Sequence, residues 1–220
     1  INAKCPAAID LHTNKSLVIY GTHDKPTKHS VEAMFHMNHY AYICSILLLT
    51  FVTSCVNHGS YAMRAERASL LSRDLQRLST TVSPSEADKM ATTAIEQSIR
   101  IAEKYKPIRI AWLNNSLVNI GLRDRGLCYH WRNDLFPPLF ELKSKTLKLR
   151  LATSSRGKYF EHNAIVVTAE NLAFEQGLIL DPWRGGGRLW WGRFDQDKYP
   201  WVLLDREQTP VALRSMLIGN

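Results

Sequence analysis

The spacing of apolar and polar residues predicts helices in the region that follows residue 60. Between residues 61 and 78, leucines fall on one side of a helix, with arginine and aspartate on the other. A second helix is expected over residues 84–105, because Ser83, Pro84 and Glu86 match an N-cap, a first-turn proline and a capping-box carboxylate. The apolar residues that these helices would bury are Leu70, Leu71, Leu75, Leu78, Met90, Ala94, Ile95, Ile99 and Ala102.

Two further helices are separated by a turn that contains glycine. The first is predicted over residues 109–122, and the turn ends at Gly126. The second begins at about Cys128. Pro137 and Pro138 are expected to stop it, because proline lacks the backbone N–H that continues a helix. Its apolar face would be formed by Leu127, Trp131 and Leu135.

The pattern changes to strands after residue 145. Residues 146–151 alternate strictly between apolar and polar, as in a half-buried strand. Residues 162–168 and 177–181 are more continuously apolar, which is typical of strands that helices cover on one side, and residues 188–191 are a fourth candidate strand. Helices followed by strands predict an α+β fold, with the N-terminal helices packed on a small antiparallel sheet.

The N-terminal region is expected to lie outside this domain. Residues 1–36 show no sustained period and are interpreted as an upstream, disordered extension. The apolar run over residues 43–52 is shorter than the roughly 20 residues of a membrane-spanning helix, but it has the length of a signal-peptide core. Met37 is therefore taken as the start of a signal peptide over residues 37–55, which leaves residues 56–220 as a single domain.

The end of the apolar run, Val52-Thr53-Ser54-Cys55, resembles the lipobox of bacterial lipoproteins. The resemblance implies that Cys55 is acylated and becomes the mature N-terminus, and Val56 implies sorting to the outer membrane. The chain would then be held in the bacterial cell envelope by its lipid anchor and would face the periplasm. The alternative is that this run forms a buried apolar helix.

The charge of the chain agrees with an envelope location. The formal net charge is +8, and it is spread along the chain without a run of lysine or arginine. A diffuse positive charge favours contact with anionic lipid head groups or cell-wall polymers. Nucleic acid is not an expected partner, because no recognised nucleic-acid module accompanies the charge. The oligomeric state is left open.

The cysteine count singles out one thiol. The chain contains four cysteines, and after the expected processing only Cys128 remains as a free thiol. A thiol in the first turn of a helix lies near the positive end of the helix dipole, which favours the thiolate. Cys128 is therefore a candidate nucleophile, although an inert buried cysteine is the alternative.

Histidine and aspartate partners follow from position. His130 lies two residues after Cys128 on the same helix, so the two side chains diverge by roughly 200° and His130 is expected to pack or hydrogen-bond instead. His162 opens a buried strand and needs a polar partner. A two-residue hairpin loop would place His162 opposite either Asp181 or Ile179, and in both registers His162 and Asp181 share a face.

Cys128, His162 and Asp181 are the residue types that acyl transfer through a thioester requires. Cys128 would be the nucleophile, His162 its general base and later acid, and Asp181 the group that orients the imidazole. The Cys128 backbone N–H would be one oxyanion donor. The candidates for a second donor are Asn114, Asn115 and Asn119. The aromatic residues that either line a substrate groove or form the core and lid of the sheet are Trp183, Trp190, Trp191, Tyr199 and Trp201.

The motifs together resemble a known family. Gly126-Leu127-Cys128 at a helix start, His162 at a strand start and Asp181-Pro182-Trp183 at a strand end are similar to the transglutaminase-like branch of the papain-like cysteine hydrolases, over about residues 105–205. The wider sequence around these motifs is similar to a group of small proteobacterial lipoproteins of unassigned function. The resemblance does not determine the substrate class; the leading hypothesis is cleavage or transfer of an amide, in a peptide or cell-wall crosslink, through a Cys128 thioester and without a cofactor. A non-catalytic binding or structural lipoprotein of the same fold is the alternative.

Two other readings of these residues remain. Cys128, His130, His162 and Asp181 are all zinc-ligand types, but their spacing matches no strong zinc motif, so no metal is expected. The run Arg184-Gly185-Gly186-Gly187-Arg188 suggests a phosphate cradle, but neither a Lys-Ser/Thr pair nor a clear helix follows it. It is interpreted as a flexible loop beside the site.

Overall fold

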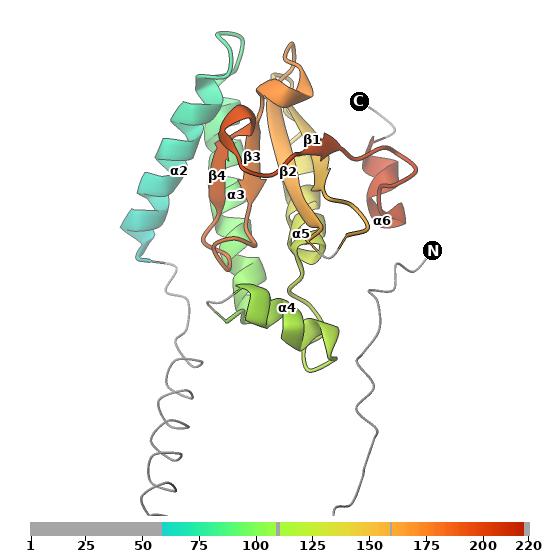
Figure 1. Cartoon of the computed structure of the whole chain (residues 1–220). Coiled ribbons are helices and arrows are strands. Elements are labelled where there is room, and N and C mark those ends of the chain that lie inside the picture. Colours follow the sequence, from blue (N-terminus) through green and yellow to red (C-terminus); the bar gives the residue numbers. More distant parts are fainter. Residues whose placement is uncertain (1–58, 109–110, 159, 218–220) are drawn as a thin grey trace, which may run out of the picture. The chain divides into compact units, whose positions relative to one another are not determined.

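The computed structural model describes residues 59–108, 111–158 and 160–217 (Figure 1). The predicted extension over residues 1–36, the signal peptide over residues 37–55 and the acylated Cys55 lie outside these residues. Among the helices that are described, none combines the length and the apolar character that crossing a membrane requires.

The described residues begin with helices. The first four are α2 (Tyr61–Gln76), α3 (Pro84–Tyr105), α4 (Ala111–Asn119) and α5 (Cys128–Phe140). A short helix α6 (Val211–Arg214) follows the sheet. The 3-10 turns are η1 (Phe174–Gln176), η2 (Phe194–Gln196) and η3 (Ser215–Leu217).

A five-stranded antiparallel sheet follows the four helices. Its strands are β1 (Leu147–Ser154), β2 (His162–Ala169), β3 (Leu178–Asp181), β4 (Trp190–Arg193) and β5 (Val202–Leu203). They are ordered β4-β3-β2-β1-β5, so β2 lies at the centre. Helices first and an antiparallel sheet second confirm the predicted α+β class.

The two faces of the sheet carry different cores. Ile165 and Val167 of β2 pack into the larger core with α2, α3 and α5; α3 and α5 lie behind the sheet in Figure 1. Ala164 and Val166 belong to a smaller core on the other face, with Trp201. Because side chains alternate along a strand, His162 points to this second face. The central strand is therefore buried on both faces, by helices on one side, as predicted, and by the smaller core on the other.

The predicted stop at Pro137 and Pro138 was wrong. Helix α5 continues to Phe140 with both prolines inside it. Each proline removes one hydrogen bond near the end of the helix, but the turn that contains them is packed: Phe136 and Leu139 are almost completely buried in the larger core. Packing of the last turn outweighs the lost hydrogen bonds.

The start of α3 was predicted at the correct residue, but the capping contacts differ. Ser83 is the N-cap and Pro84 the first residue, yet the Ser83 side chain makes no capping hydrogen bond. Glu86 instead accepts hydrogen bonds from the backbone N–H groups of Lys145 and Thr146, at the entry to β1. The carboxylate therefore joins the helix to the sheet rather than closing a capping box.

The remaining differences lie at the edges. The third predicted helix, over residues 109–122, is shorter in the structure and ends at Asn119. Strand β5 and helix α6 were not predicted. Both residues of β5 are exposed, so no apolar pattern marks the strand, and it forms by pairing with β1.

Candidate active site

Cys128 is the first residue of α5, and a tight loop delivers it there. Gly126 has a φ of +137°, and a Cβ at this position would lie 2.4 Å from the Nδ2 atom of Asn114. The backbone N–H groups of Gly126 and Leu127 both donate to Nδ1 of His130, at 3.2 and 3.3 Å. His130 thus has the hydrogen-bonding role expected of it, and its imidazole stabilises the loop rather than contacting a substrate.

The environment of His130 keeps it neutral. Burial, together with the charge of Arg125, lowers the pKa of His130 to about 4. A neutral imidazole has one ring nitrogen free to accept, which is what two backbone donors require.

His162 and Asp181 share a face, but in neither of the two expected registers. Ile165 of β2 pairs with Leu180 of β3, which places Asp181 level with Ala164 and diagonal to His162. The connection between the strands includes η1, so it is longer than the two-residue loop that was assumed. The offset is still even, and both side chains project into the second face.

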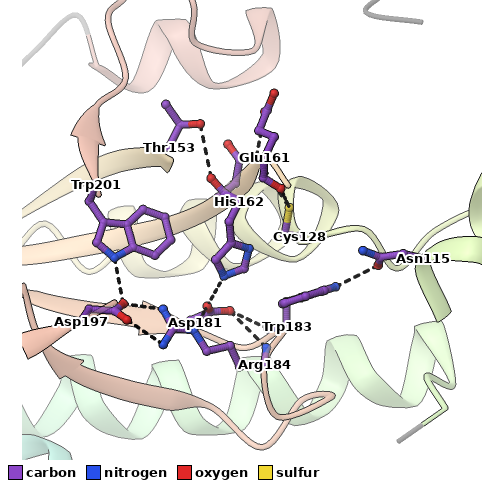
Figure 2. Close-up of polar contacts among 11 residues, drawn as sticks. Asn115, Cys128, Thr153, Glu161, His162, Asp181, Trp183, Arg184, Asp197 and Trp201 are labelled. Carbon is purple, nitrogen blue, oxygen red and sulfur yellow. Dashed lines mark hydrogen bonds and ion pairs between the residues drawn. The ribbon is translucent and has the colours of Figure 1, made fainter. Parts of the chain in front are cut away.

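The two side chains are in direct contact. Nε2 of His162 lies 2.5 Å from Oδ2 of Asp181, and the two residues are 2% and 0% exposed. Burial acts to lower the pKa of His162, but hydrogen bonds with Asp181 and Cys128 raise it to about 9. Since Nε2 faces Asp181, Nδ1 is the ring nitrogen left for Cys128. Figure 2 shows the imidazole pointing at Asp181, with Cys128 beside the ring.

Asp181 is itself held by several donors. Its Oδ1 accepts from the backbone N–H groups of Trp183 and Arg184, at 3.1 and 3.2 Å. Oδ2 also accepts from Nε of Arg184, at 2.7 Å. The other end of the Arg184 guanidinium pairs with Asp197, whose Oδ2 accepts from Nε1 of Trp201 at 2.8 Å. This network fixes the carboxylate that faces His162.

Aromatic rings enclose the imidazole. The ring centroids of Trp183, Tyr199 and Trp201 lie 4.8, 4.6 and 5.2 Å from that of His162. The guanidinium of Arg184 lies over the ring of Trp190, with its Cζ atom 3.8 Å from the ring centroid. These side chains therefore pack the catalytic candidates in place. Trp190 contacts the site through Arg184.

Two groups contact the Cys128 sulfur besides His162. Sγ lies 3.7 Å from the backbone oxygen of Glu161 and 3.7 Å from Nδ2 of Asn163. The thiol can donate to the Glu161 carbonyl, whereas the thiolate can accept from the Asn163 amide. Cys128 is 7% exposed, so only a small part of the residue faces solvent.

The candidate asparagines of α4 differ in their contacts. Nδ2 of Asn114 donates to the backbone oxygen of Gly126 at 3.2 Å, so this buried amide supports the loop. Oδ1 of Asn115 accepts from Nε1 of Trp183 at 3.1 Å, on the Cys128 side of the site (Figure 2). Asn119 is exposed at the end of the helix.

Of the four residues of zinc-ligand type, His130 stands apart from Cys128, His162 and Asp181. Nδ1 of His130 is taken up by its own loop, and the described residues contain no group of three or more His, Cys, Asp or Glu side chains suited to a metal ion. In the glycine-rich run, Arg184 points into the site and pairs with Asp181.

Sequence reasoning missed Arg184 and Asp197 as parts of the site. Arg184 was placed in a flexible loop, and Asp197 lies in a segment without a recognisable motif. The only signal in the sequence was the position of Arg184, which directly follows the Asp-Pro-Trp motif. The chain matches no known protein family, no curated protein and no solved structure. Its function must therefore follow from its own residues.

Proposed function

We propose that the domain is a cysteine hydrolase or acyltransferase of the transglutaminase-like, papain-like type, acting on amide bonds in peptides or cell-wall crosslinks. The observation that carries the proposal is the contact order of three side chains. Asp181 holds Nε2 of His162 at 2.5 Å, and a hydrogen bond with Cys128, at the start of a helix, helps to raise the pKa of the same imidazole. This order is the one that nucleophilic acyl transfer requires.

Each group has a defined step. The Cys128 thiolate attacks the amide carbon, and the carbonyl electron pair moves to oxygen to form a tetrahedral oxyanion. When that intermediate collapses, the C–N bond breaks and protonated His162 gives its Nδ1 proton to the leaving amine. Water or an acceptor amine then attacks the thioester, with His162 as base, and the thiolate is released. Asp181 keeps the imidazole oriented and stabilises its charged form.

The oxyanion donors lie at the start of α5 and on α4. The Cys128 backbone N–H belongs to the first turn of its helix, where N–H groups have no intrahelical acceptor. Asn115 supplies the second donor: its Oδ1 is held by Trp183, which leaves Nδ2 to donate. Two donors aimed at the developing charge are the usual composition of an oxyanion hole.

The proposal includes the location of the protein. Acylated Cys55 would hold the domain at the periplasmic face of the outer membrane, where peptide and cell-wall amides are present. Membrane fractions of cells that express the full chain test this anchor. The chain should pellet with membranes, and the Cys55→Ser chain should be found in the soluble fraction. Retention of the Cys55→Ser chain would show that acylation is not the attachment.

One observation favours a second function, a non-catalytic binding module of the same fold. Cys128, His162 and Asp181 are all buried, and the cavity next to them, lined by Asn114, Gly126 and Trp183, has a volume of only about 10 Å³. Such a cavity holds at most about one water molecule.

Alkylation of Cys128 by iodoacetamide across pH separates the two functions. In the full chain, reaction is followed at the Cys128 peptide by mass spectrometry, and the same peptide in the urea-unfolded chain is the reference thiol. An enzyme should react faster than the reference near pH 7, and His162→Ala should slow it at least about tenfold. A rate no higher than the reference, unchanged in His162→Ala, would exclude the enzyme and leave the binding module as the remaining proposal.

A further inference from the structure

Arg132 is a buried cation on the same helix as the nucleophile. It lies four residues after Cys128, one turn along the same face of α5, and is 4% exposed. Its guanidinium donates to the amide oxygens of Asn133 and Asn163, and no ion pair among the described residues involves it. A buried charge with only neutral acceptors is costly, and in proteins such groups are often functional.

Arg132 sets the orientation of the neighbouring amide. Guanidinium has donors only, so the oxygen of the Asn163 amide must face Arg132. The amide nitrogen is then directed away from it. One of its hydrogens goes to the Cys128 sulfur at 3.7 Å and the other to Oε1 of Glu161 at 3.0 Å. Every hydrogen-bonding group of this side chain except the second lone pair of its oxygen is thereby used.

The charges around the sulfur come from three places. His162 faces it from β2 and Arg132 from α5, while Glu161 and Arg156 precede β2. Glu161 is partly neutralised, because its second oxygen accepts from the backbone N–H of Gly157 at 2.8 Å. Burial lowers the pKa of Arg132 to about 10, so the guanidinium stays charged at neutral pH. The ring of Tyr199 packs on the imidazole, and its phenol also lies within the electrostatic reach of Cys128.

We infer that Arg132 and Asn163 are positioning residues for the nucleophile: Asn163 donates a hydrogen bond to the Cys128 thiolate, and Arg132 holds that amide in the donating orientation and adds positive charge behind it. The inference rests on the proposed function and extends it. It gives the thiolate a second source of stabilisation besides His162.

Asn163→Asp is the sharpest variant. Aspartate has the same shape and gains an ion pair with Arg132, while its second oxygen comes to lie beside Oε1 of Glu161, so urea denaturation is used to show that the fold is retained. It also replaces an N–H donor at the sulfur by a carboxylate oxygen, which repels a thiolate. We expect alkylation of Cys128 at pH 7 to slow about tenfold or more, and the midpoint of its pH–rate profile to rise by at least about one unit. A merely structural role would not lower reactivity while stability is kept.

Arg132→Gln and Arg132→Lys complete the test. Glutamine removes the charge and should shift the profile upward, whereas lysine keeps the charge and should restore part of the loss. Arg193→Gln is the control, because Arg193 pairs with Asp195 on the exposed surface. It should leave the profile unchanged. Should Arg132→Gln fail to fold, Asn163→Asp and Arg132→Lys still decide the question.

The outcomes distinguish failure of this inference from failure of the proposed cysteine hydrolase or acyltransferase. If wild-type Cys128 reacts fast, His162→Ala slows it, and Asn163→Asp leaves the profile in place while urea unfolding shows a stable fold, the inference is wrong and the proposed enzyme stands. If wild-type Cys128 reacts no faster than in the unfolded chain, the proposed function fails, and the inference fails with it.

Discussion

Oδ2 of Asp181 lies 2.5 Å from Nε2 of His162, although the two residues are not directly paired across β2 and β3. The diagonal arrangement has a consequence for the ring. With Nε2 committed to the carboxylate, only Nδ1 is left to exchange a proton with Cys128. The orientation of the imidazole is therefore determined by Asp181, and by the donors that hold Asp181 in turn.

Asp181→Asn should remove the charge and replace one of the two acceptor oxygens by a donor. Arg184 and His162 would lose their buried partner, so we expect the free energy of unfolding to fall by about 3–5 kcal/mol, measured by urea denaturation. Alkylation of Cys128 at neutral pH should slow as well. Asp195→Asn is the control, because Asp195 pairs with Arg193 on the exposed surface and should change stability by less than about 0.5 kcal/mol. Equal effects of the two substitutions would contradict the buried network.

The stability of the fold should fall at alkaline pH because of His162. Its pKa is about 9 in the folded chain, above the ordinary value of 6.5, since Asp181 and Cys128 outweigh the effect of burial. A raised pKa stabilises the fold fully below about pH 6.5, and this contribution is lost as the pH rises through about 9. We expect the unfolding free energy to decline across that window, by at most about 1.4 kcal/mol per pH unit.

His162→Gln isolates this contribution. The difference in unfolding free energy between wild type and His162→Gln should be largest near pH 6 and should shrink toward pH 10, as measured by urea denaturation at fixed ionic strength. A difference that is constant with pH would mean that His162 does not carry a raised pKa in the folded chain.

The residues that the sequence predicted well are those whose side chains repeat with the period of their element. Leu71, Leu75 and Met90 are buried as expected, because a helix packed by one face must repeat its apolar residues at helical spacing. Strand β5 is an element that the sequence did not predict. Its residues are exposed and its position depends on pairing with β1, which no local pattern records.

The site likewise contains residues that the sequence predicted and residues that it did not. His162 and Asp181 were placed on one face because side chains alternate along strands, and any even register keeps them together. Arg184 was not assigned, because its role depends on Asp197, which the fold brings beside it from beyond β4. Arg132 shows the same limit: a polar residue inside an apolar helix face is explained only by the strand that packs on it.

Glu86 should matter to stability at ordinary pH. Burial acts to raise the pKa of this carboxyl, but hydrogen bonds from Ser144 and Thr146 and from two backbone N–H groups lower it to about 2. Its stabilising effect is present above about pH 4.5 and is lost as the pH falls through about 2. Glu86→Gln replaces one acceptor oxygen by a donor and should cost about 1–3 kcal/mol at pH 7 by urea denaturation.

The exposed Glu175 provides the matched control for this change. Glu175→Gln should leave the unfolding free energy within about 0.5 kcal/mol of the wild type. If Glu86→Gln were as mild as Glu175→Gln, the link between α3 and the entry to β1 would not contribute to the fold.

Asn115 can be tested as an oxyanion donor by comparing two reactions of Cys128. Hydrolysis of p-nitrophenyl acetate passes through an oxyanion, whereas alkylation by iodoacetamide does not. Asn115→Ala should therefore slow ester hydrolysis by about 10²–10³ and leave alkylation nearly unchanged. Trp183→Phe, which removes the N–H that orients the Asn115 amide, should slow ester hydrolysis by a smaller factor. Asn119→Ala, at the exposed end of the same helix, should alter neither reaction. A parallel loss of both reactions in Asn115→Ala would mean that Asn115 supports the site through packing, and that the second oxyanion donor lies elsewhere.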